Sequence, residues 1–341
     1  MTNRRLKELD YMRVIACISV VLIHITAMGV VGYLTGSIHS KIMIFMNRSL
    51  QYATTLFVFL SGMTCYGSFE KCNEDFRLFL KRRFSTIIYP YIAVCLVYYG
   101  SYIYLGYYSF DPVFLVKGIL TGTLCYHLYF IIILVQMYLL VPIFGRLFKI
   151  FSDEFVLAVV LAINIMTLEV SFPLSDRVFF KYMFFFAAGI YVLRNYGIVM
   201  KVLKRKKVKV FSALVFAATS LVYSYLYAAN NANLIYGWFL HCSLSIPFLY
   251  VTGLFLGKMT KGLYSKVNLL GKSSYYIYLI HPLFLSFYVR VVDGTSVTSF
   301  SAKLLLYTAT VLVTSIFSSI GYVTLKDRYG KKARLKKKMP A

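Results

Sequence analysis

Three ionisable residues near the start of the chain, Asp10, Arg13 and His24, could carry chemistry because they lie in or beside one apolar segment. On an α-helix, the 11 positions from Arg13 to His24 make about three turns plus 20°. The 14 positions from Asp10 to His24 fall about 40° short of four turns, so the three side chains share one stripe. Along that stripe a carboxylate can orient a guanidinium, and a histidine about 16 Å beyond the guanidinium can take up or release a proton. The plainer alternative is that Arg13 reaches the lipid headgroups and His24 hydrogen-bonds a neighbouring helix.

Other histidines and one acid form a second set of candidates. His127, His241 and His281 fall, on the topology given below, between the middle of the membrane and its outer half. A histidine there can act as an acid or a base, although a structural hydrogen bond is the commoner role for each of them taken singly. Glu169 is the only acid well inside the apolar part of a span, and it could pair with a histidine or with Arg48.

A basic cluster, Lys81-Arg82-Arg83, lies just inside the end of one predicted span. The guanidinium groups of arginine can bind phosphate oxygens with two hydrogen bonds. Anchoring of the helix end at the cytoplasmic membrane surface explains the cluster equally well. The motifs of soluble enzymes, such as a Walker A loop, HExxH or GxSxG, do not occur in the sequence. Ser61-Gly62 is interpreted as a helix-packing or kink element.

The elements that must position these residues are membrane-spanning helices. The chain of 341 residues is 60% hydrophobic and 14% charged, whereas a globular chain is about 45–50% apolar and about 25% charged. Its 37 Lys and Arg against 12 Asp and Glu give a net charge of +25. A nucleic-acid-binding protein can be that basic but is not also this apolar, so we expect no nucleic-acid partner. The six cysteines form no CxxC pair and fall mostly in apolar runs, so they are interpreted as packing residues without a metal or disulfide role.

Ten segments are apolar enough for a span of about 20 residues. They are 11–31, 42–66, 86–105, 124–145, 155–173, 179–195, 210–228, 235–256, 273–292 and 301–323. The stretch 106–123, interrupted by Asp111-Pro112, is interpreted as an interfacial loop. The sequence therefore predicts an all-α, polytopic membrane helix bundle of about ten transmembrane helices.

The basic residues give an independent test of this topology, because cytoplasmic loops collect Lys and Arg. With both termini cytoplasmic, 29 of the 37 Lys and Arg lie in inner segments, six lie in outer segments and two lie within spans. We therefore predict a multi-pass protein of the cell membrane whose basic loops contact anionic lipids of the inner leaflet. We expect one membrane domain, residues 1–325, and a basic cytoplasmic tail, residues 326–341. Any catalytic or binding site must therefore lie within the helix bundle or at one of its two membrane surfaces.

Five motifs, in order, resemble those of the acyltransferase 3 family, membrane enzymes that acylate sugars and other cell-surface molecules. They are Asp10 with Arg13 and His24 (Arg-x10-His), Phe57-Val58-Phe59-Leu60-Ser61-Gly62, Arg83 through Pro90-Tyr91, Tyr126-His127-Leu128-Tyr129-Phe130, and Tyr275-Tyr276-Ile277-Tyr278-Leu279-Ile280-His281-Pro282. Two positions depart from the family pattern. Thr86 stands where a second arginine is often found, and Tyr129 stands where tryptophan is usual.

The resemblance implies transfer of an acyl group, often acetyl, from cytoplasmic acyl-CoA to a hydroxyl of a cell-surface polysaccharide or lipid-linked sugar. On that hypothesis His24 is the general base, Asp10 orients Arg13, and Arg13 with Arg82 and Arg83 holds the donor. The candidates for the acceptor side are His127, Tyr278, His281 and Glu169. Acyl-CoA is then a substrate, and no bound cofactor or metal is expected.

Several alternatives stay open at this stage. A transporter or flippase for a polysaccharide or lipid-linked sugar also fits a chain of ten spans with charges inside the membrane. A sensor or scaffold in a cell-wall assembly complex is a third interpretation. The sequence identifies neither the acceptor nor the acyl group, and it leaves both direct transfer and a covalent acyl-enzyme possible.

Overall fold

This computed structural model describes residues 6–231, 234–294, 297 and 299–336, which form helices joined by turns and loops, without a strand. This confirms the predicted all-α class. The chain divides into two compact units, and each is described by itself. The first contains Met1–Ala53, Phe216–Asn230 and Pro247–Ala341, and the second contains Thr54–Val215 and Asn231–Ile246.

Seven helical stretches in the described residues are long and apolar enough to cross a membrane. They are α1 (Glu8–Gly32), α4 to α5 (Phe76–Tyr104), α7 (Tyr129–Ile150), α11 (Lys206–Ala228), α12 (Leu234–Met259), α13 (Tyr264–Asp293) and the part Phe300–Tyr329 of α14 (Phe300–Lys336). An eighth span arises if α9 (Met183–Arg194) and α10 (Tyr196–Leu203), which meet at a bend of 95°, cross together. The protein is therefore a multi-pass membrane protein.

Three of the ten predicted spans are not continuous helices of that length, and one of them, 179–195, contains the 12-residue helix α9 described above. The segment 42–66 is divided between α2 (Ile38–Ser49) and α3 (Tyr52–Glu70), and the segment 155–173 contains α8 (Asp153–Met166), which has 14 residues. The stretch 106–123, predicted to be a loop, contains the short helix α6 (Pro112–Thr121). The count of ten spans and the cytoplasmic position of both termini stay predictions.

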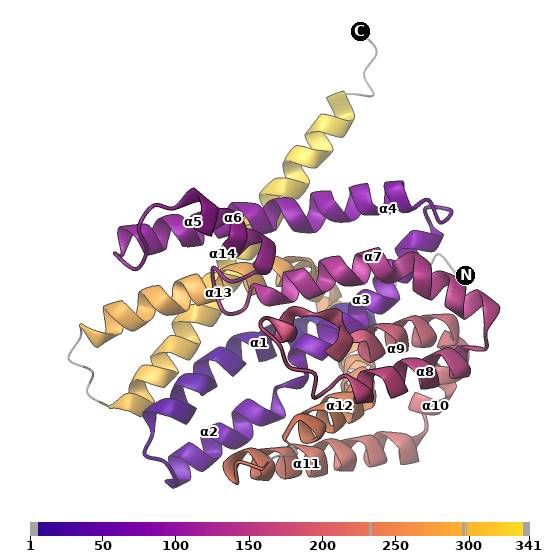
Figure 1. The fold of residues 1–341 in the computed structure, drawn as a ribbon, viewed down its shortest axis with the longest axis horizontal. Helices are drawn as coiled ribbons and strands as arrows, with labels where there is room; N and C mark the ends of the chain where they lie inside the picture. The colour runs from indigo at the N-terminus through magenta and orange to yellow at the C-terminus, as the bar shows by residue number, and fades with distance from the viewer. Residues whose placement is uncertain (1–5, 232–233, 295–296, 298, 337–341) are drawn as a thin grey trace. The chain divides into compact units, whose positions relative to one another are not determined.

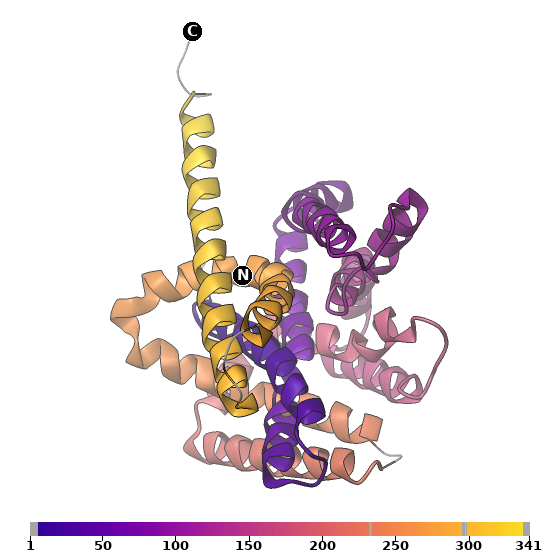
Figure 2. The same ribbon diagram turned by 90° about the vertical axis from the view of Figure 1, so that its left-hand side faces the viewer.

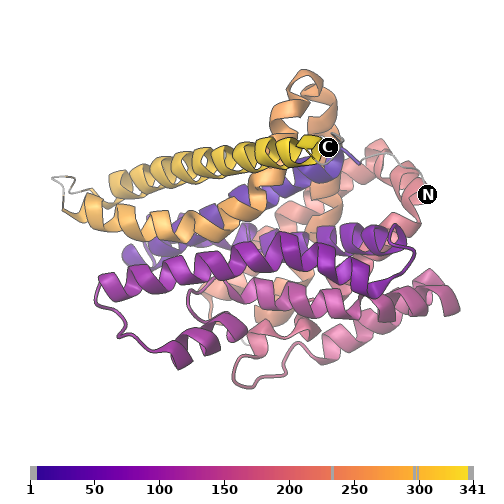
Figure 3. The same ribbon diagram turned by 90° about the horizontal axis from the view of Figure 1, so that it is seen from above.

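The first unit is built around α1, which packs against α2, α13 and α14. Figures 1 and 3 show α13 and α14 side by side, running in opposite directions, with α1 next to α13. The side-chain amide of Asn47 on α2 donates to the Ile23 carbonyl oxygen of α1 at 2.8 Å and to Thr26 Oγ1 at 3.0 Å. These bonds tie α2 to the middle of α1, where His24 lies.

The end of α14 continues beyond the helix that it packs on. Figure 2 shows its C-terminal turns extending past α13. Near this end, Lys326 Nζ donates to Tyr276 Oη at 2.9 Å, and Asp327 Oδ2 lies 3.6 Å from Lys272 Nζ, both partners belonging to α13. Residues 337–341 of the predicted tail lie outside the described residues, so the division at residue 325 stays a prediction.

The second unit contains a close contact between α3 and α9. A Cβ atom added at Gly62 would meet the carbonyl oxygen of Phe186, and one added at Gly189 would meet the carbonyl oxygen of Phe59. Small residues allow membrane helices to approach this closely. Ser61-Gly62 is predicted to be a helix-packing or kink element, and the contact at Gly62 supports packing.

Proline shapes the helix that follows the basic cluster. Between α4 (Phe76–Arg83) and α5 (Tyr89–Tyr104), residues Phe84–Ile88 form a π-helical turn. Pro90 has no N–H to donate to the carbonyl oxygen of Thr86 four residues earlier. The backbone N–H of Tyr89 instead bonds the carbonyl oxygen of Phe84 five residues back, which widens the helix just after Arg83.

Candidate active site

The first two turns of α1 hold a partly buried ion pair. The side chain of Arg13 donates from Nη1 to Oδ1 of Asp10 at 2.8 Å, and Tyr264 donates its hydroxyl to Oδ2 of the same carboxylate at 2.8 Å. Asp10 is 1% exposed, while the Arg13 side chain is 27% exposed. The carboxylate therefore fixes the arginine from the buried side and leaves part of the guanidinium accessible. This confirms the geometric prediction that the two residues share a helix face.

The backbone of α13 approaches Asp10 closely. A Cβ atom on Gly271 would lie 3.3 Å from the carbonyl oxygen of Asp10, which is tighter than ordinary van der Waals contact. About two turns before Gly271, α13 begins at Tyr264. The Lys7 ammonium lies 4.6 Å from the centre of the Tyr264 ring. A bare backbone at Gly271 thus allows α13 to cover the carboxylate.

His24 lies further along α1, against a second histidine on α13. The rings of His24 and His281 are stacked, with centroids 5.2 Å apart and planes 26° from parallel. His281 is fully buried, and its Nδ1 lies 2.8 Å from the Tyr278 carbonyl oxygen and 3.1 Å from that of Ile277. The Tyr278 ring is 6.3 Å from the His281 ring. The structure therefore brings three predicted site residues together in one place.

The basic cluster belongs to the second unit. Lys81 and Arg82 are exposed, and Arg82 Nη1 lies 3.4 Å from Cys72 Sγ. Arg83 is half-buried: it donates to the Thr64 carbonyl oxygen of α3 at 2.8 Å, and its guanidinium carbon lies 5.6 Å from the centre of the Phe79 ring. Arg83 thus holds α4 against α3, which is a structural role that the sequence did not suggest. That Arg82 and Arg83 bind the donor stays a prediction.

Thr86, which stands where the family often has another arginine, hydrogen-bonds the backbone of the basic cluster Lys81-Arg82-Arg83. Its hydroxyl donates to the carbonyl oxygens of Arg82 at 3.0 Å and Arg83 at 3.1 Å. These bonds pair polar groups of the widened turn.

The remaining acceptor-side candidates, His127 and Glu169, also belong to the second unit. His127 is 2% exposed, and its ring meets those of Tyr98 and Tyr126 edge-on, with centroids 5.6 and 5.8 Å apart. Glu169 follows the end of α8 and hydrogen-bonds the Tyr236 side chain. The acceptor-side role of His127 and Glu169 stays a prediction.

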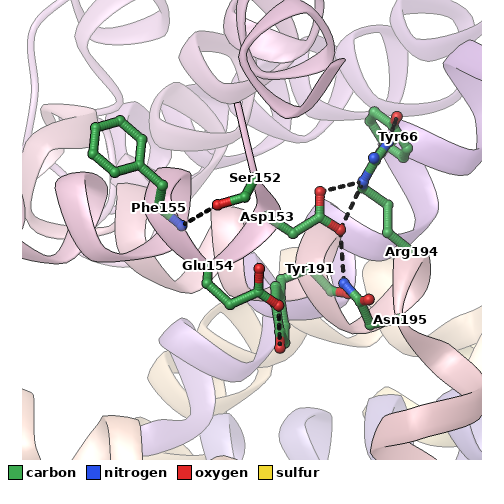
Figure 4. Close-up of polar contacts among 8 residues, drawn as sticks. All are labelled: Tyr66, Ser152, Asp153, Glu154, Phe155, Tyr191, Arg194 and Asn195. Carbon is green, nitrogen blue, oxygen red and sulfur yellow. Dashed lines mark hydrogen bonds and ion pairs between the residues drawn. The ribbon is translucent and has the colours of Figure 1, made fainter. Parts of the chain in front are cut away.

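Two polar clusters were missed from the sequence. Tyr264 is one of many tyrosines, and no local pattern marks it as a partner of Asp10, which is 254 residues away. The other cluster joins α8, α9 and α3 in the second unit (Figure 4). Arg194 Nε lies 2.9 and 3.0 Å from the two oxygens of Asp153, Arg194 Nη1 donates to Tyr66 Oη at 2.9 Å, and Asn195 donates to Asp153 at 2.7 Å.

The Asp153–Arg194 cluster is built as a structural clamp. Asp153 lies in the first turn of α8, after Ser152, whose Oγ accepts from the Phe155 N–H at 3.3 Å. Arg194 lies in the last turn of α9. Each charge therefore has the sign that its helix dipole favours, and the pair joins the two helix ends.

Elsewhere in the described residues, no three His, Cys, Asp or Glu side chains gather as metal ligands would. The six cysteines are all buried with free thiols, in accord with packing roles.

Comparison with known proteins gives the following matches. Residues 6–323 match the sequence model of a family described as an acyltransferase domain, Acyl_transf_3. The chain is 25% identical over 295 residues to proteins of Staphylococcus aureus strains MSSA476 and MW2, each named "Probable poly-beta-1,6-N-acetyl-D-glucosamine export protein". These alignments cover 82% of this chain and 82% of each relative. No solved structure matches the chain.

Proposed function

Because the chain belongs to the acyltransferase 3 family of membrane O-acyltransferases, we propose that it moves an acyl group, specifically acetyl, from cytoplasmic acyl-CoA to a sugar hydroxyl. The acceptor is a cell-surface polysaccharide or a lipid-linked sugar. In this reaction the hydroxyl oxygen bonds to the thioester carbonyl carbon as the carbon–sulfur bond breaks. The hydroxyl proton passes to a base on the protein and then to the CoA thiolate.

The observation that carries this proposal is the pairing of two features on α1. Arg13 is fixed by Asp10 near one end of the helix, and His24 lies against His281 further along the same stripe. A partly exposed guanidinium suits the phosphates of CoA, and a histidine about 16 Å away along the axis suits proton transfer. We propose that Arg13 binds the donor, that Asp10 orients Arg13, and that His24 is the general base. Donor binding by Arg82 and Arg83 of the second unit stays an expectation from the sequence.

We propose that Tyr278 and His281 of the first unit lie on the acceptor side of the His24 site. The same role for His127 and Glu169 of the second unit stays an expectation from the sequence. The enzyme would act in the cell membrane, where its basic loops contact anionic lipids.

The direct test is consumption of acetyl-CoA by the purified protein in lipid nanodiscs. We would measure CoA thiol release with a short β-linked glucosamine oligosaccharide as acceptor, for wild type and His24→Ala. The matched control is His39→Ala, because His39 is also stacked on an aromatic ring of α1's C-terminal end, that of Tyr33 at 5.2 Å, but is exposed.

We expect thiol release from wild type and His39→Ala and a loss of about 100-fold or more in His24→Ala. Equal thiol release in wild type and His24→Ala would remove the proposed role of His24. No release with any acyl-CoA or sugar acceptor would remove the enzymatic proposal itself.

A second candidate function is export of a polysaccharide. The observation that favours it is the name of the Staphylococcus aureus relatives, which describes probable export of poly-beta-1,6-N-acetyl-D-glucosamine. An exporter moves its substrate without consuming acyl-CoA. Retained polymer inside cells that lack the protein, together with no acyl-CoA turnover by the purified protein, would favour export over acyl transfer.

A further inference from the structure

The residue that follows His281 determines how the His281 ring is held. Pro282 lies inside α13 and has no N–H to donate to the Tyr278 carbonyl oxygen four residues earlier. Nδ1 of His281 bonds that oxygen at 2.8 Å instead, and it also lies 3.1 Å from the Ile277 carbonyl oxygen. The His281-Pro282 pair therefore replaces a backbone hydrogen bond by a side-chain bond.

This bond defines the tautomer of His281. A carbonyl oxygen only accepts hydrogen bonds, so Nδ1 must carry the hydrogen. In a neutral imidazole the other nitrogen, Nε2, then holds the lone pair. The ring orientation is set by the helix backbone, and His281 itself is fully buried. A ring fixed in this way makes a rigid surface for the imidazole that stacks on it.

The stacked ring is that of His24, the proposed general base. The contact that the structure shows between His24 and His281 is a stack of the two rings, with planes 26° from parallel. A neutral ring beneath His24 can stabilise the positive charge that His24 gains when it accepts a proton. A proton on His281 would instead repel that charge, because two like charges at this distance disfavour each other.

We propose that His281 is a positioning residue for the acyl-transfer reaction: its neutral ring, held by the Tyr278 carbonyl oxygen, fixes the orientation of His24 and supports the charge that His24 acquires. This inference rests on the proposed function of the His24 site. It differs from a role in contacting the acceptor, because His281 acts through His24.

The titratable groups around His281 come from two helices. His24 faces it from α1, and Tyr278 faces it from α13 itself. α14 also packs on α13, where Lys303 and Tyr307 contact Asp293, Lys326 contacts Tyr276 and Asp327 contacts Lys272.

The test compares His281→Phe, which keeps an aromatic ring for stacking, with His281→Ala, which removes it. Both are purified in nanodiscs with wild type, and kcat and KM for acetyl-CoA are measured from pH 5 to 9, together with the midpoint of thermal unfolding. His39→Phe is the matched control, because it changes the other stacked histidine of this unit at the same ring separation, 5.2 Å.

We expect His281→Ala to lower kcat about tenfold or more with KM for acetyl-CoA within about twofold of wild type. We expect His281→Phe to keep more of kcat than His281→Ala at its optimal pH. The acid limb of its pH–activity profile should move to higher pH, because no proton on residue 281 can then oppose protonation of His24. His39→Phe should leave the rate and the profile unchanged.

Wild-type rates and an unchanged pH profile in both His281 variants would overturn the inference while leaving the proposed function intact. Equal losses in both variants with an unchanged profile would show that His281 serves packing alone, which also overturns it. If wild type turns over no acyl-CoA, the proposed function fails and the inference fails with it. If His281→Ala does not fold, the pH–activity profile of a folded His281→Phe protein still tests the inference.

Discussion

The guanidinium of Arg13 lies 2.8 Å from the carboxylate of Asp10, three residues earlier on α1, and the second oxygen of that carboxylate accepts the hydroxyl of Tyr264 at 2.8 Å. Asp10 is buried and Arg13 is partly exposed, so the pair is arranged to present the arginine. A buried carboxylate that has both oxygens bonded loses little freedom when a ligand binds the arginine. We therefore regard Asp10 and Tyr264 as the support of a donor-binding residue.

Asp10→Asn should raise KM for acetyl-CoA about tenfold, because a charge-assisted bond to Arg13 worth about 1.5–3 kcal/mol is weakened. Effects on kcat should be smaller, since the carboxylate lies far from His24 along the helix. Tyr264→Phe should give a weaker effect in the same direction. Steady-state kinetics with varied acetyl-CoA checks both variants.

The control for Tyr264 is Tyr33→Phe, which removes a hydroxyl that bonds Ser301 at 2.6 Å at the other end of α1. It should leave KM for acetyl-CoA unchanged. A KM in Asp10→Asn equal to that of wild type would contradict the supporting role of the carboxylate.

Gly62→Ala and Gly189→Ala should each destabilise the protein, by about 1–3 kcal/mol, because a methyl group at either position meets the backbone of the partner helix. The thermal unfolding midpoint in detergent measures the effect. Gly100→Ala in α5 is the matched control, since a Cβ there meets nothing within 4 Å, and it should be neutral or stabilising. Wild-type midpoints for both interface variants would show that α3 and α9 do not approach as closely as described.

Arg194→Ala should lower stability by about 1–3 kcal/mol, because it removes the charge-assisted bonds that join α9 to Asp153 of α8 and to Tyr66 of α3. The expected loss is in the unfolding midpoint, with KM for acetyl-CoA unchanged in the folded fraction. Lys149→Ala breaks an exposed ion pair with Glu74 and should cost about 0–1 kcal/mol. A larger loss in Lys149→Ala than in Arg194→Ala would contradict the clamp.

Pro282→Ala should separate activity from stability. The new N–H at residue 282 can bond the Tyr278 carbonyl oxygen and compete with Nδ1 of His281. Alanine also favours the helix, so the unfolding midpoint should be equal to or above that of wild type. We expect kcat to fall several-fold, about three- to tenfold, as the His281 ring loses its fixed orientation. Unchanged kcat would argue against the importance of this bond.

The stripe on α1 could be predicted because a single helix has a fixed period, and this period places Asp10, Arg13 and His24 on one face. The stacking partner of His24 could not be predicted, because it depends on how α1 and α13 pack. Tyr264 was missed for the same reason, since its bond to Asp10 joins residues that are 254 positions apart.

The division of segment 42–66 has a physical cause that carries little local signal. Neither Gly nor Pro lies at the junction of α2 and α3. Asn47 is instead held by Ile23 and Thr26 of α1, and Gln51 donates to Asn47 at 3.2 Å. These tertiary and side-chain bonds accompany the end of α2 at Ser49, whereas hydropathy averages over the whole segment. The early end of α8 is similar, because the hydroxyl of Thr167 bonds the carbonyl oxygen of Ile163 at 2.9 Å inside an apolar run.

The central claim is that His24 carries acyl transfer to a surface glycan, and the most direct measurement is the O-acyl content of surface polysaccharide in living cells. Three strains are compared: wild type, His24→Ala, and a strain without the gene, with equal membrane levels of the first two proteins. The account predicts that His24→Ala falls to the level of the strain without the gene. Wild-type O-acylation in the His24→Ala strain would contradict it.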